Sequence, residues 1–284
     1  MLTHIKNVIN WAEKNKCAVG AFNTFNLETT LAIAQAANKM KTPVIIQVTE
    51  STLKYAGLKN IFNIIKSVSE NEEIKIPITI HLDHGKDLQI IKKCIKLGFS
   101  SIHFDGSELS YQKNLTLTRK VVKYAHKRKV WVQGELGRIL GSKNVSGELK
   151  ESDLQKSLTS PGQAREFVKK TGIDTLAPSV GALHGVYKGR ENLKQALIKQ
   201  IAKEINIPLV LHGGSGVSQK DLVQAIKNGI RVVNIDTELR QAFTESLRKV
   251  LKKDLKVFDP RKILYPEIEA MQKVVEEKIL ILKK

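Results

Sequence analysis

Short runs of β-branched and aliphatic residues alternate along the chain with longer stretches in which apolar residues recur at helical spacing. The apolar runs predict eight strands, over Cys17–Asn23, Val44–Thr49, Ile78–His84, Ser101–Asp105, Val130–Glu135, Thr175–Val180, Leu209–His212 and Val232–Asp236. Runs such as PLVLHGG are continuously apolar, which is typical of parallel strands that are covered on both faces.

The segments between these runs predict helices. Leu27–Lys41 repeats apolar residues at helical spacing, and Asp87–Leu97 and Gln219–Asn228 each stop at a glycine that suits a C-terminal cap. Eight strand–helix units imply an α/β fold, a closed parallel (β/α)8 or TIM barrel with right-handed crossovers. We expect one domain over residues 1–284, with an extra N-terminal helix and a C-terminal helical extension over Glu267–Leu280.

One connection departs from this rhythm. Leu136–Ser160 is rich in glycine, serine and lysine and has no clear period. Long irregular loops in compact domains are usually functional or disordered, so we expect a mobile flap after the fifth strand.

Composition excludes several classes of protein. The chain has 284 residues, of which 42% are hydrophobic and 26% charged, which is globular rather than disordered. The net charge is +19, but the lysines are scattered and only 5% of residues are aromatic, so solvated helix faces explain it better than a specific nucleic-acid surface. There is no membrane-length apolar run and no signal-peptide core, and the two cysteines form no disulfide framework, so we expect a cytoplasmic protein.

Candidate chemistry gathers where the predicted strands end, the edge that carries the active site in such barrels. The side chains there are Asp83, His84, Asp105, Glu135, His184, His212, Asn234, Asp236 and Arg240. Three histidines on three strands, each followed by glycine, predict a catalytic metal site with an open position. Zn²⁺ is the commonest match, although Co²⁺, Fe²⁺ or Mn²⁺ also suit imidazole. The other four histidines, His4, His81, His103 and His126, we interpret as structural or surface residues.

Glycines after the last two strands indicate a second function. Backbone N–H groups of Gly213–Ser215 and Asn234–Thr237 fall where these barrels recurrently bind phosphate. A helix starting at Thr237 would add its N-terminal dipole, and Lys188 a point charge. The alternative is that these glycines only allow tight turns. The residues alone thus indicate a metal-dependent barrel enzyme acting on a phosphorylated small molecule, with Asp83 as a candidate acid/base.

Together these motifs resemble one family across essentially the whole chain. GAFNTFNLE, HLDHG, FDGSEL, ELG, GALHG, LHGGSG, NIDT and FDPRKIL are similar to the class II, metal-dependent ketose-bisphosphate aldolases, the fructose-bisphosphate type in particular. The resemblance implies zinc ligation by His84, His184 and His212, proton transfer by Asp83, and a second metal, found in some members, at Asp105 and Glu135.

The resemblance also implies how a sugar bisphosphate is held. One phosphate end would contact Gly185, Lys188, Gly213, Gly214, Ser215, Asn234, Ile235, Asp236 and Thr237, and Arg240 would contact the other phosphate. Arg261 would reach the site of a neighbouring subunit, since family members form dimers or tetramers. The implied reaction is reversible cleavage of fructose 1,6-bisphosphate to dihydroxyacetone phosphate and glyceraldehyde 3-phosphate. Whether a monovalent cation assists the phosphate loop stays open.

Two departures from the family pattern stand out. Many members read VEAELG after the fifth strand, where this chain has VQGELG, with Gln133 for the first glutamate. The flap glutamate that exchanges a proton with the substrate aligns with Lys143, so Glu148, Glu151 or a water would have to replace it.

Three functional hypotheses follow. Asp236 and Arg240 favour fructose 1,6-bisphosphate, because relatives acting on its C4 epimer, tagatose 1,6-bisphosphate, more often have alanine at the aspartate position. The alternatives are an aldolase for tagatose 1,6-bisphosphate or another phosphorylated ketose, and a catalytically impaired aldolase fold acting as a basic binding protein.

Overall fold

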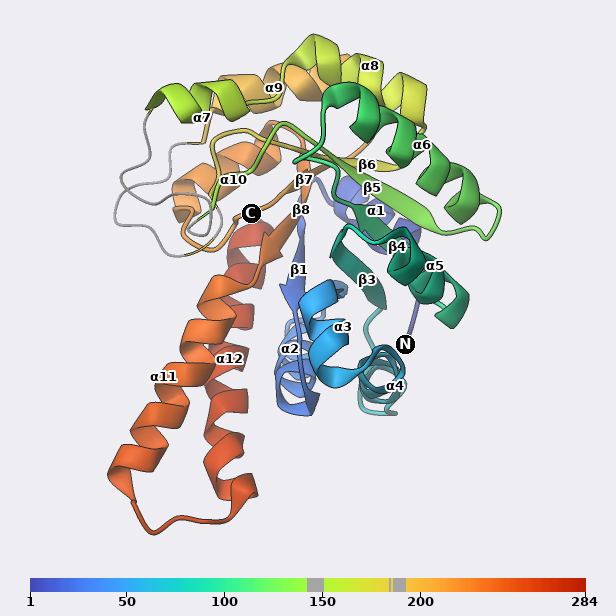
Figure 1. Ribbon diagram of the computed structural model, residues 1–284. Helices are drawn as coiled ribbons and strands as arrows, with labels where there is room; N and C mark the ends of the chain where they lie inside the picture. The colour runs from blue at the N-terminus through green and yellow to red at the C-terminus, as the bar shows by residue number, and fades with distance from the viewer. Residues whose placement is uncertain (142–150, 184, 186–192) are drawn as a thin grey trace.

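The computed structural model describes residues 1–141, 151–183, 185 and 193–284. Parallel strands close into a barrel in the order β1 to β8, and β1 pairs with both β2 and β8 (Figure 1). The strands are β1 (Val19–Asn23), β2 (Val44–Thr49), β3 (Ile78–Gly85), β4 (Ser101–Phe104), β5 (Trp131–Leu136), β6 (Thr175–Pro178), β7 (Leu209–Leu211) and β8 (Ile230–Ile235). The expected TIM barrel is confirmed, and the predicted strand positions differ from the observed ones by three residues or fewer.

The helices lie outside the barrel and alternate with its strands. They are α1 (Ile5–Lys14), α2 (Leu27–Lys39), α3 (Glu50–Ala56), α4 (Leu58–Ser69), α5 (Leu88–Leu97), α6 (Tyr111–His126), α7 (Glu151–Ser157), α8 (Pro161–Thr171), α9 (Gln195–Glu204), α10 (Gln219–Lys227), α11 (Thr237–Lys253) and α12 (Pro260–Leu282). The apolar faces of most of these helices, α1 excepted, pack on the outer side of the sheet and form one large core cluster with it.

The amino end of the barrel is closed by α1, the expected extra N-terminal helix. Ile5, Val8, Ile9 and Ala12 of this helix are fully buried against the strands, in a separate apolar cluster that includes Val210 and Val232. The ring of His4 accepts the backbone N–H of Lys6 and so caps the helix. In the part of the chain that the structure describes, this end of the barrel is filled by apolar side chains and contributes to stability.

The C-terminal extension begins earlier than the sequence predicted. The predicted start was Glu267, but α12 begins at Pro260, where proline costs no hydrogen bond, and continues through Pro266. Asp259 caps it by accepting the N–H of Arg261. The helix packs on α2 and on α11, and with α11 it forms a hairpin that projects from the barrel (Figure 1).

The segment expected to be an irregular flap is partly helical, because residues 151–157 form α7. Residues 142–150 of that segment, which include Lys143 and Glu148, lie outside the described residues. None of the helices in the described ranges has both the length and the apolar character needed to cross a bilayer.

Candidate active site

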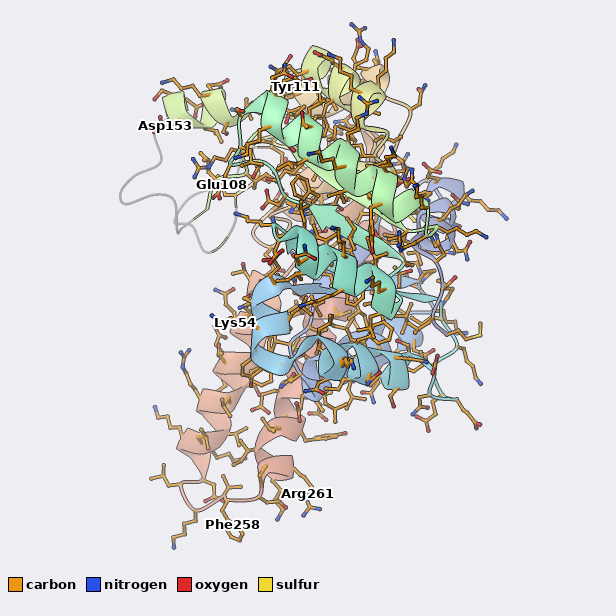
Figure 2. All side chains as sticks on the ribbon, turned by 45° about the vertical axis from the view of Figure 1, so that its right-hand side comes forward. Lys54, Glu108, Tyr111, Asp153, Phe258 and Arg261 are labelled. Carbon is orange, nitrogen blue, oxygen red and sulfur yellow. The ribbon has the colours of Figure 1, made fainter. Side chains whose placement is uncertain are left out.

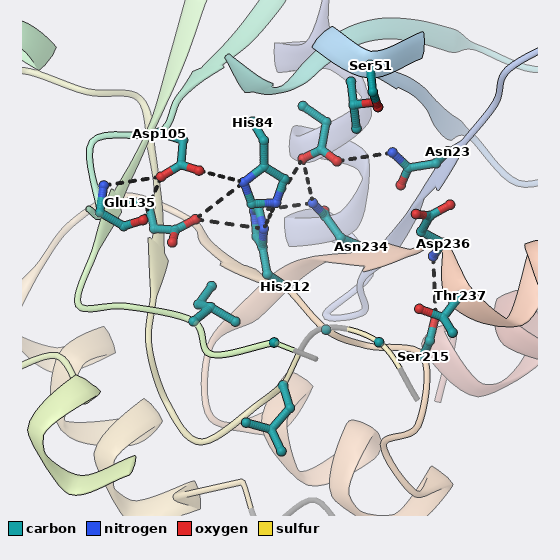
Figure 3. Close-up of a pocket in the computed structure, with 18 of the residues that line it drawn as sticks. Asn23, Ser51, His84, Asp105, Glu135, His212, Ser215, Asn234, Asp236 and Thr237 are labelled. Atoms are coloured by element: carbon teal, nitrogen blue, oxygen red, sulfur yellow. Dashed lines mark hydrogen bonds and ion pairs between the residues drawn. The ribbon is translucent and has the colours of Figure 1, made fainter. Parts of the chain in front are cut away.

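A cavity of about 530 Å³ opens at the carboxyl end of the barrel (Figure 3). This volume suits a small-molecule ligand. The described residues that line it come from the ends of the strands and the loops after them: Asn23, Thr49, Ser51, Asp83, His84, Lys86, Asp105, Ser107, Glu108, Glu135, Arg138, Ile139, Gly141, Leu183, Gly185, His212, Gly213, Ser215, Asn234, Asp236, Thr237 and Arg240.

A bulge at the end of β3 brings two consecutive side chains to this cavity. The register with β4 shifts between Leu82 and Gly85, and His84 adopts a left-handed φ of 49°. Successive residues of a regular strand face opposite sides, so the bulge is what lets both Asp83 and His84 line the cavity. The N–H of His84 donates to Nδ1 of His103 at 3.2 Å, which holds the strained residue in place.

Two histidine nitrogens converge at the floor of the cavity. Nε2 of His84 lies 3.2 Å from Nδ1 of His212. In a tetrahedral zinc site with bonds of 2.0–2.1 Å, two ligand nitrogens lie about 3.3 Å apart. The spacing therefore fits two ligands of one metal ion. The other nitrogen of His84 contacts Oδ2 of Asp105 at 3.0 Å, the carboxylate contact that commonly orients a metal-binding histidine.

Two overlapping groups of side chains present ligand atoms within 4.8 Å of one another. One is Asp83, His84, His103 and His212, and the other is His84, His103, Asp105 and Glu135. The Oε2 atom of Glu135 is buried and has no hydrogen-bond partner among the described residues. A buried carboxylate oxygen beside several histidines is a donor set that suits a divalent cation.

The electrostatics of the cavity floor also favour a cation. Burial by itself would lower the pKa of His84, but Asp83, Asp105 and Glu135 outweigh it and raise that pKa to about 10. Burial, together with the charge of Asp105, raises the pKa of Glu135 to about 8. Both shifts have the same origin, because several carboxylates share one poorly solvated space and any positive charge there is stabilised.

Asp83 is held in a fixed orientation by two amides. Asn23 Nδ2 donates to its Oδ2 at 3.1 Å, and Asn234 Nδ2 lies 3.4 Å from its Oδ1. Oδ1 is also 3.8 Å from Nε2 of His84. Burial opposes ionisation of Asp83, but the neighbouring charges of His84 and His212 keep its pKa well below the usual range. The side chain is therefore an ionised acceptor beside the convergent nitrogens.

The loop after β7 lies close to other backbone at Gly213. This residue has a φ of 68°, and a Cβ there would come within 2.4 Å of the carbonyl oxygen of Leu183. Only glycine suits such a position. Ser215 follows, and its Oγ accepts the N–H of Asp236 at 3.2 Å, which connects this loop to the start of α11.

Positive side chains surround the rest of the cavity. Arg240, on the first turn of α11, donates from Nε to Oδ1 of Asp236 at 2.7 Å. Lys86 and Arg138, which the sequence analysis did not select, line the cavity near Glu108. The cavity therefore combines a carboxylate–imidazole floor with cationic walls, as an anionic ligand with metal-binding oxygens would require.

Comparison with known proteins identifies the family. The model for class II fructose-bisphosphate aldolases matches residues 3–284. The chain belongs to this family. It is 41% identical over 276 residues to the fructose-bisphosphate aldolase of Geobacillus stearothermophilus, covering 96% of this chain and 94% of the relative. It is 38% identical over 281 residues to that of Staphylococcus epidermidis, covering 98% of this chain and 96% of the relative.

Solved structures agree with the sequence relatives. The YdjI aldolase of Escherichia coli matches with a TM-score of 0.86 at 29% identity, over 99% of this chain and 97% of that one. The fructose-bisphosphate aldolase of Campylobacter jejuni matches with a TM-score of 0.81 at 25% identity, over 99% and 95%. The resemblance seen in the motifs is confirmed.

Most of the residues selected from the sequence meet in the aldolase cavity. Those that line it are Asp83, His84, Asp105, Glu135, Gly185, His212, Gly213, Ser215, Asn234, Asp236, Thr237 and Arg240. His184 and Lys188 lie outside the described residues.

Three selected residues are not part of this lining. The N–H of Gly214 donates to the carbonyl of Asn234 at 3.0 Å, and Ile235 is fully buried in the core. Neither presents a group to the cavity, because Gly214 connects the two loops and Ile235 faces the helices. Arg261 lies at the far tip of the α11–α12 hairpin and pairs with Asp259 (Figure 2).

Of the four remaining histidines, His103 is the one that sequence analysis assigned too little importance. It is fully buried, and its ring lies 5.0 Å from that of His84 and 5.1 Å from that of His212 between centroids. The sequence feature that could have identified it is its position two residues before Asp105 at the end of a short strand. Side chains two residues apart in a strand point to the same face of the sheet. His81 is a buried partner of Ser101, and His126 is a surface partner of Asp174, both as expected.

Proposed function

We propose that this protein catalyses reversible aldol cleavage of fructose 1,6-bisphosphate to dihydroxyacetone phosphate and glyceraldehyde 3-phosphate, with a divalent metal ion. One observation carries the proposal. The convergent His84 and His212 nitrogens, 3.2 Å apart, lie directly beside the ionised Asp83 at the floor of a cavity with cationic walls. The related enzymes that are named fructose-bisphosphate aldolases support the choice of reaction.

His84 and His212 would hold the metal together with His184, and Zn²⁺ is the ion that this donor set favours. Bound there, the ion would act as a Lewis acid that polarises the ketone and stabilises the negative charge left when the carbon–carbon bond breaks. Asp105 and Glu135 are the residues that would hold a second ion, as in some family members. The proposal also includes a monovalent cation bound near the phosphate loop.

Asp83 is the acid/base in this mechanism. Its carboxylate accepts the proton of the C4 hydroxyl as the C3–C4 bond breaks, which releases glyceraldehyde 3-phosphate. In the synthetic direction the same atom returns the proton. Asn23 and Asn234 hold the carboxylate in one orientation by donating to its two oxygens, so little reorganisation is needed at the moment of transfer. The depressed pKa keeps Asp83 ionised at neutral pH and thus ready to accept.

The two phosphates would bind on different parts of the cavity wall. Gly213, Ser215 and Thr237 belong to the loops after β7 and β8, where barrels of this type bind phosphate, and Thr237 is the first residue of α11. Gly185 and Lys188 would complete that end. Arg240 would bind the second phosphate after exchanging its contact with Asp236.

Glu151, one candidate for the missing flap glutamate, is exposed in α7, where it contacts Gln155 and Lys194. It is not in the described lining of the cavity. We therefore propose that a water or Glu148 exchanges the second proton.

We also propose that two or four copies assemble through the α11–α12 hairpin. Leu255 and Phe258 at its tip are each 90% exposed, and Arg261 extends beside them. Large apolar side chains exposed to this degree are typical of contact surfaces.

Both cysteines are free and buried, which supports the expected reducing cytoplasm.

The decisive experiment measures cleavage of fructose 1,6-bisphosphate and of tagatose 1,6-bisphosphate by the purified protein. Each sugar is tested before chelation, after chelation and after restoration of Zn²⁺. We expect activity on the fructose sugar that disappears on chelation and returns with zinc. Preference for tagatose would change the substrate but keep the chemistry. Failure to cleave either sugar by folded, zinc-loaded protein would refute the proposal.

A further inference from the structure

Gln133 contacts His212, a proposed metal ligand, at the ring nitrogen that faces away from His84. It lies on β5 with its side chain in the barrel interior, 4% exposed, and its amide Nε2 is 2.7 Å from Nε2 of His212. The opposite nitrogen of that ring, Nδ1, faces Nε2 of His84. His212 thus presents one nitrogen to the cavity floor and the other to Gln133.

The state of His212 decides whether its Nδ1 can bind a metal. A neutral imidazole carries one proton, and a metal takes the nitrogen without it, so ligation through Nδ1 requires the proton on Nε2. A protonated Nε2 needs a hydrogen-bond acceptor. The nitrogen end of an amide can only donate, whereas its oxygen end accepts, and a half-turn of the amide exchanges the two ends.

Gln133 is the amide that can supply this acceptor. Asn234 Nδ2 also lies near Nε2 of His212, at 3.2 Å, but the same nitrogen is directed at the carboxylate of Asp83. A carboxylate only accepts, so turning Asn234 would set oxygen against oxygen. Within the described chain, the side chain of Gln133 makes no hydrogen bond to Asp83 that would prevent this turn.

The barrel interior offers a place for the nitrogen of a turned Gln133. A cavity of about 10 Å³, roughly the room for one water, lies below it and is lined by Gln47, His81, Gln133 and Asn234 among others. Gln47 Oε1 and His81 Nε2 are buried and have no hydrogen-bond partner within the described part of the chain. Both can accept a hydrogen bond, directly or through one water, so the half-turn would satisfy groups on both sides of the amide.

We propose that Gln133 is a positioning residue for the metal site. Its amide oxygen accepts the Nε2 proton of His212 when metal is bound and so fixes the ring form whose Nδ1 ligates. This inference rests on the proposed metal-dependent function. It adds that an uncharged acceptor behind His212 controls how strongly this chain binds its metal.

The first test is zinc affinity, measured by competition with a chromophoric chelator and without any sugar. Gln133→Leu removes the acceptor, and we expect zinc binding to weaken about 10- to 100-fold. Gln133→Glu, whose carboxylate can only accept, is expected to bind zinc at least as tightly as the natural protein. Gln195→Leu is the control, because Gln195 is a half-buried amide that contacts Asp221 and Asn228, outside the cavity and away from His212. Its zinc affinity is expected to stay within about twofold.

The second test observes the ring form of His212 directly in the natural protein. Nitrogen-15 NMR of histidine-labelled, zinc-loaded natural protein reports which ring nitrogen of His212 carries the proton, with His212→Gln used to assign the signal. A proton on Nε2 supports the proposal, and a proton on Nδ1 overturns it. Equal zinc affinity of Gln133→Leu and the natural protein also overturns it. A folded protein that binds zinc as expected but cleaves no sugar would refute the proposed function and leave this inference standing.

Discussion

The same strands end in an apolar cluster at one end of the barrel and in a polar cavity at the other. At the amino end, Ile5 and Ile9 of α1 seal the interior with apolar contacts. At the carboxyl end, Asp83, His84 and Glu135 collect polar and charged groups around a cavity. The first arrangement gains stability from burial, and the second gives up part of it to hold like charges together. The difference teaches that a parallel barrel can separate the residues that keep it folded from those that do chemistry.

The largest effect is expected at the open end. Asp83→Asn removes the proposed proton acceptor while keeping the side-chain size, so cleavage should fall about 10²- to 10⁴-fold with little change in stability. Steady-state kinetics and thermal melting of the same preparation check both halves. Glu204→Gln, on a surface ion pair with Arg165, is the control and should retain full activity. Near-normal turnover by Asp83→Asn would remove this residue from the mechanism.

The closed end should respond in the opposite way. Ile9→Ala leaves a hole in a fully buried apolar cluster, and we expect a loss of about 2–5 kcal/mol in the free energy of unfolding. The folded fraction should keep its kcat/KM. Urea unfolding and kinetics at 25 °C measure the two quantities, with the half-exposed Leu280→Ala as the control for a mild loss. If Ile9→Ala lowers kcat/KM while the protein is folded, the two ends are coupled and the comparison fails.

A smaller effect is expected on the cavity wall. Arg240→Ala removes one charge-assisted contact, worth about 1.5–3 kcal/mol, so KM for the bisphosphate should rise roughly 10- to 100-fold with kcat less affected. Arg240→Lys should recover part of the loss, since lysine keeps the charge without the planar geometry. Arg165→Ala, outside the cavity, is the matched control. An unchanged KM would place the second phosphate elsewhere, with Lys86 and Arg138 next to be examined.

The smallest effect is expected for Cys94, in the core cluster between the barrel and its helices. Burial raises the pKa of Cys94, on α5, to about 12. The thiol should therefore stay protonated and unreactive toward a disulfide reagent at pH 8–9, and react only after denaturation. Since the folded pKa lies above the ordinary value, the associated stability is complete below about pH 9 and is lost as the pH rises toward 12. Rapid labelling of Cys94 in native protein at pH 8 would contradict this.

The sequence allowed most of the barrel to be predicted because the strand pattern is local. Continuous apolar runs and terminal glycines such as Gly98 identify elements without knowledge of their partners. The start of α12 was predicted too late, because its packing against α2 and α11 involves residues that lie elsewhere in the sequence. The helical part of the flap, α7, was missed because seven residues carry too weak a period.

Within the site, the residues at the strand ends could be predicted from the sequence. The contacts of residues deeper inside the barrel could not. Asp83 and His84 could be found as neighbours in HLDHG, but the bulge that turns both toward the cavity has no sequence signature of its own. His103 and Gln133 lie directly opposite each other on β4 and β5. Their contacts with His84 and His212 depend on barrel closure, which a linear pattern does not reveal.

The pairing of β1 with β8 sets a condition on synthesis. Val19 and Val232 are direct partners, and the N–H of Ala18 donates to the carbonyl of Leu282 in the last helix. In a nascent chain β1 therefore cannot pair along both of its edges until β8 has left the ribosome. The half-built sheet has two unpaired edges during all that time, which is the state most exposed to aggregation and to chaperone capture. For this barrel the order of translation delays the proposed metal site until the end, because His212 follows the seventh strand and its neighbour Asn234 lies on the eighth.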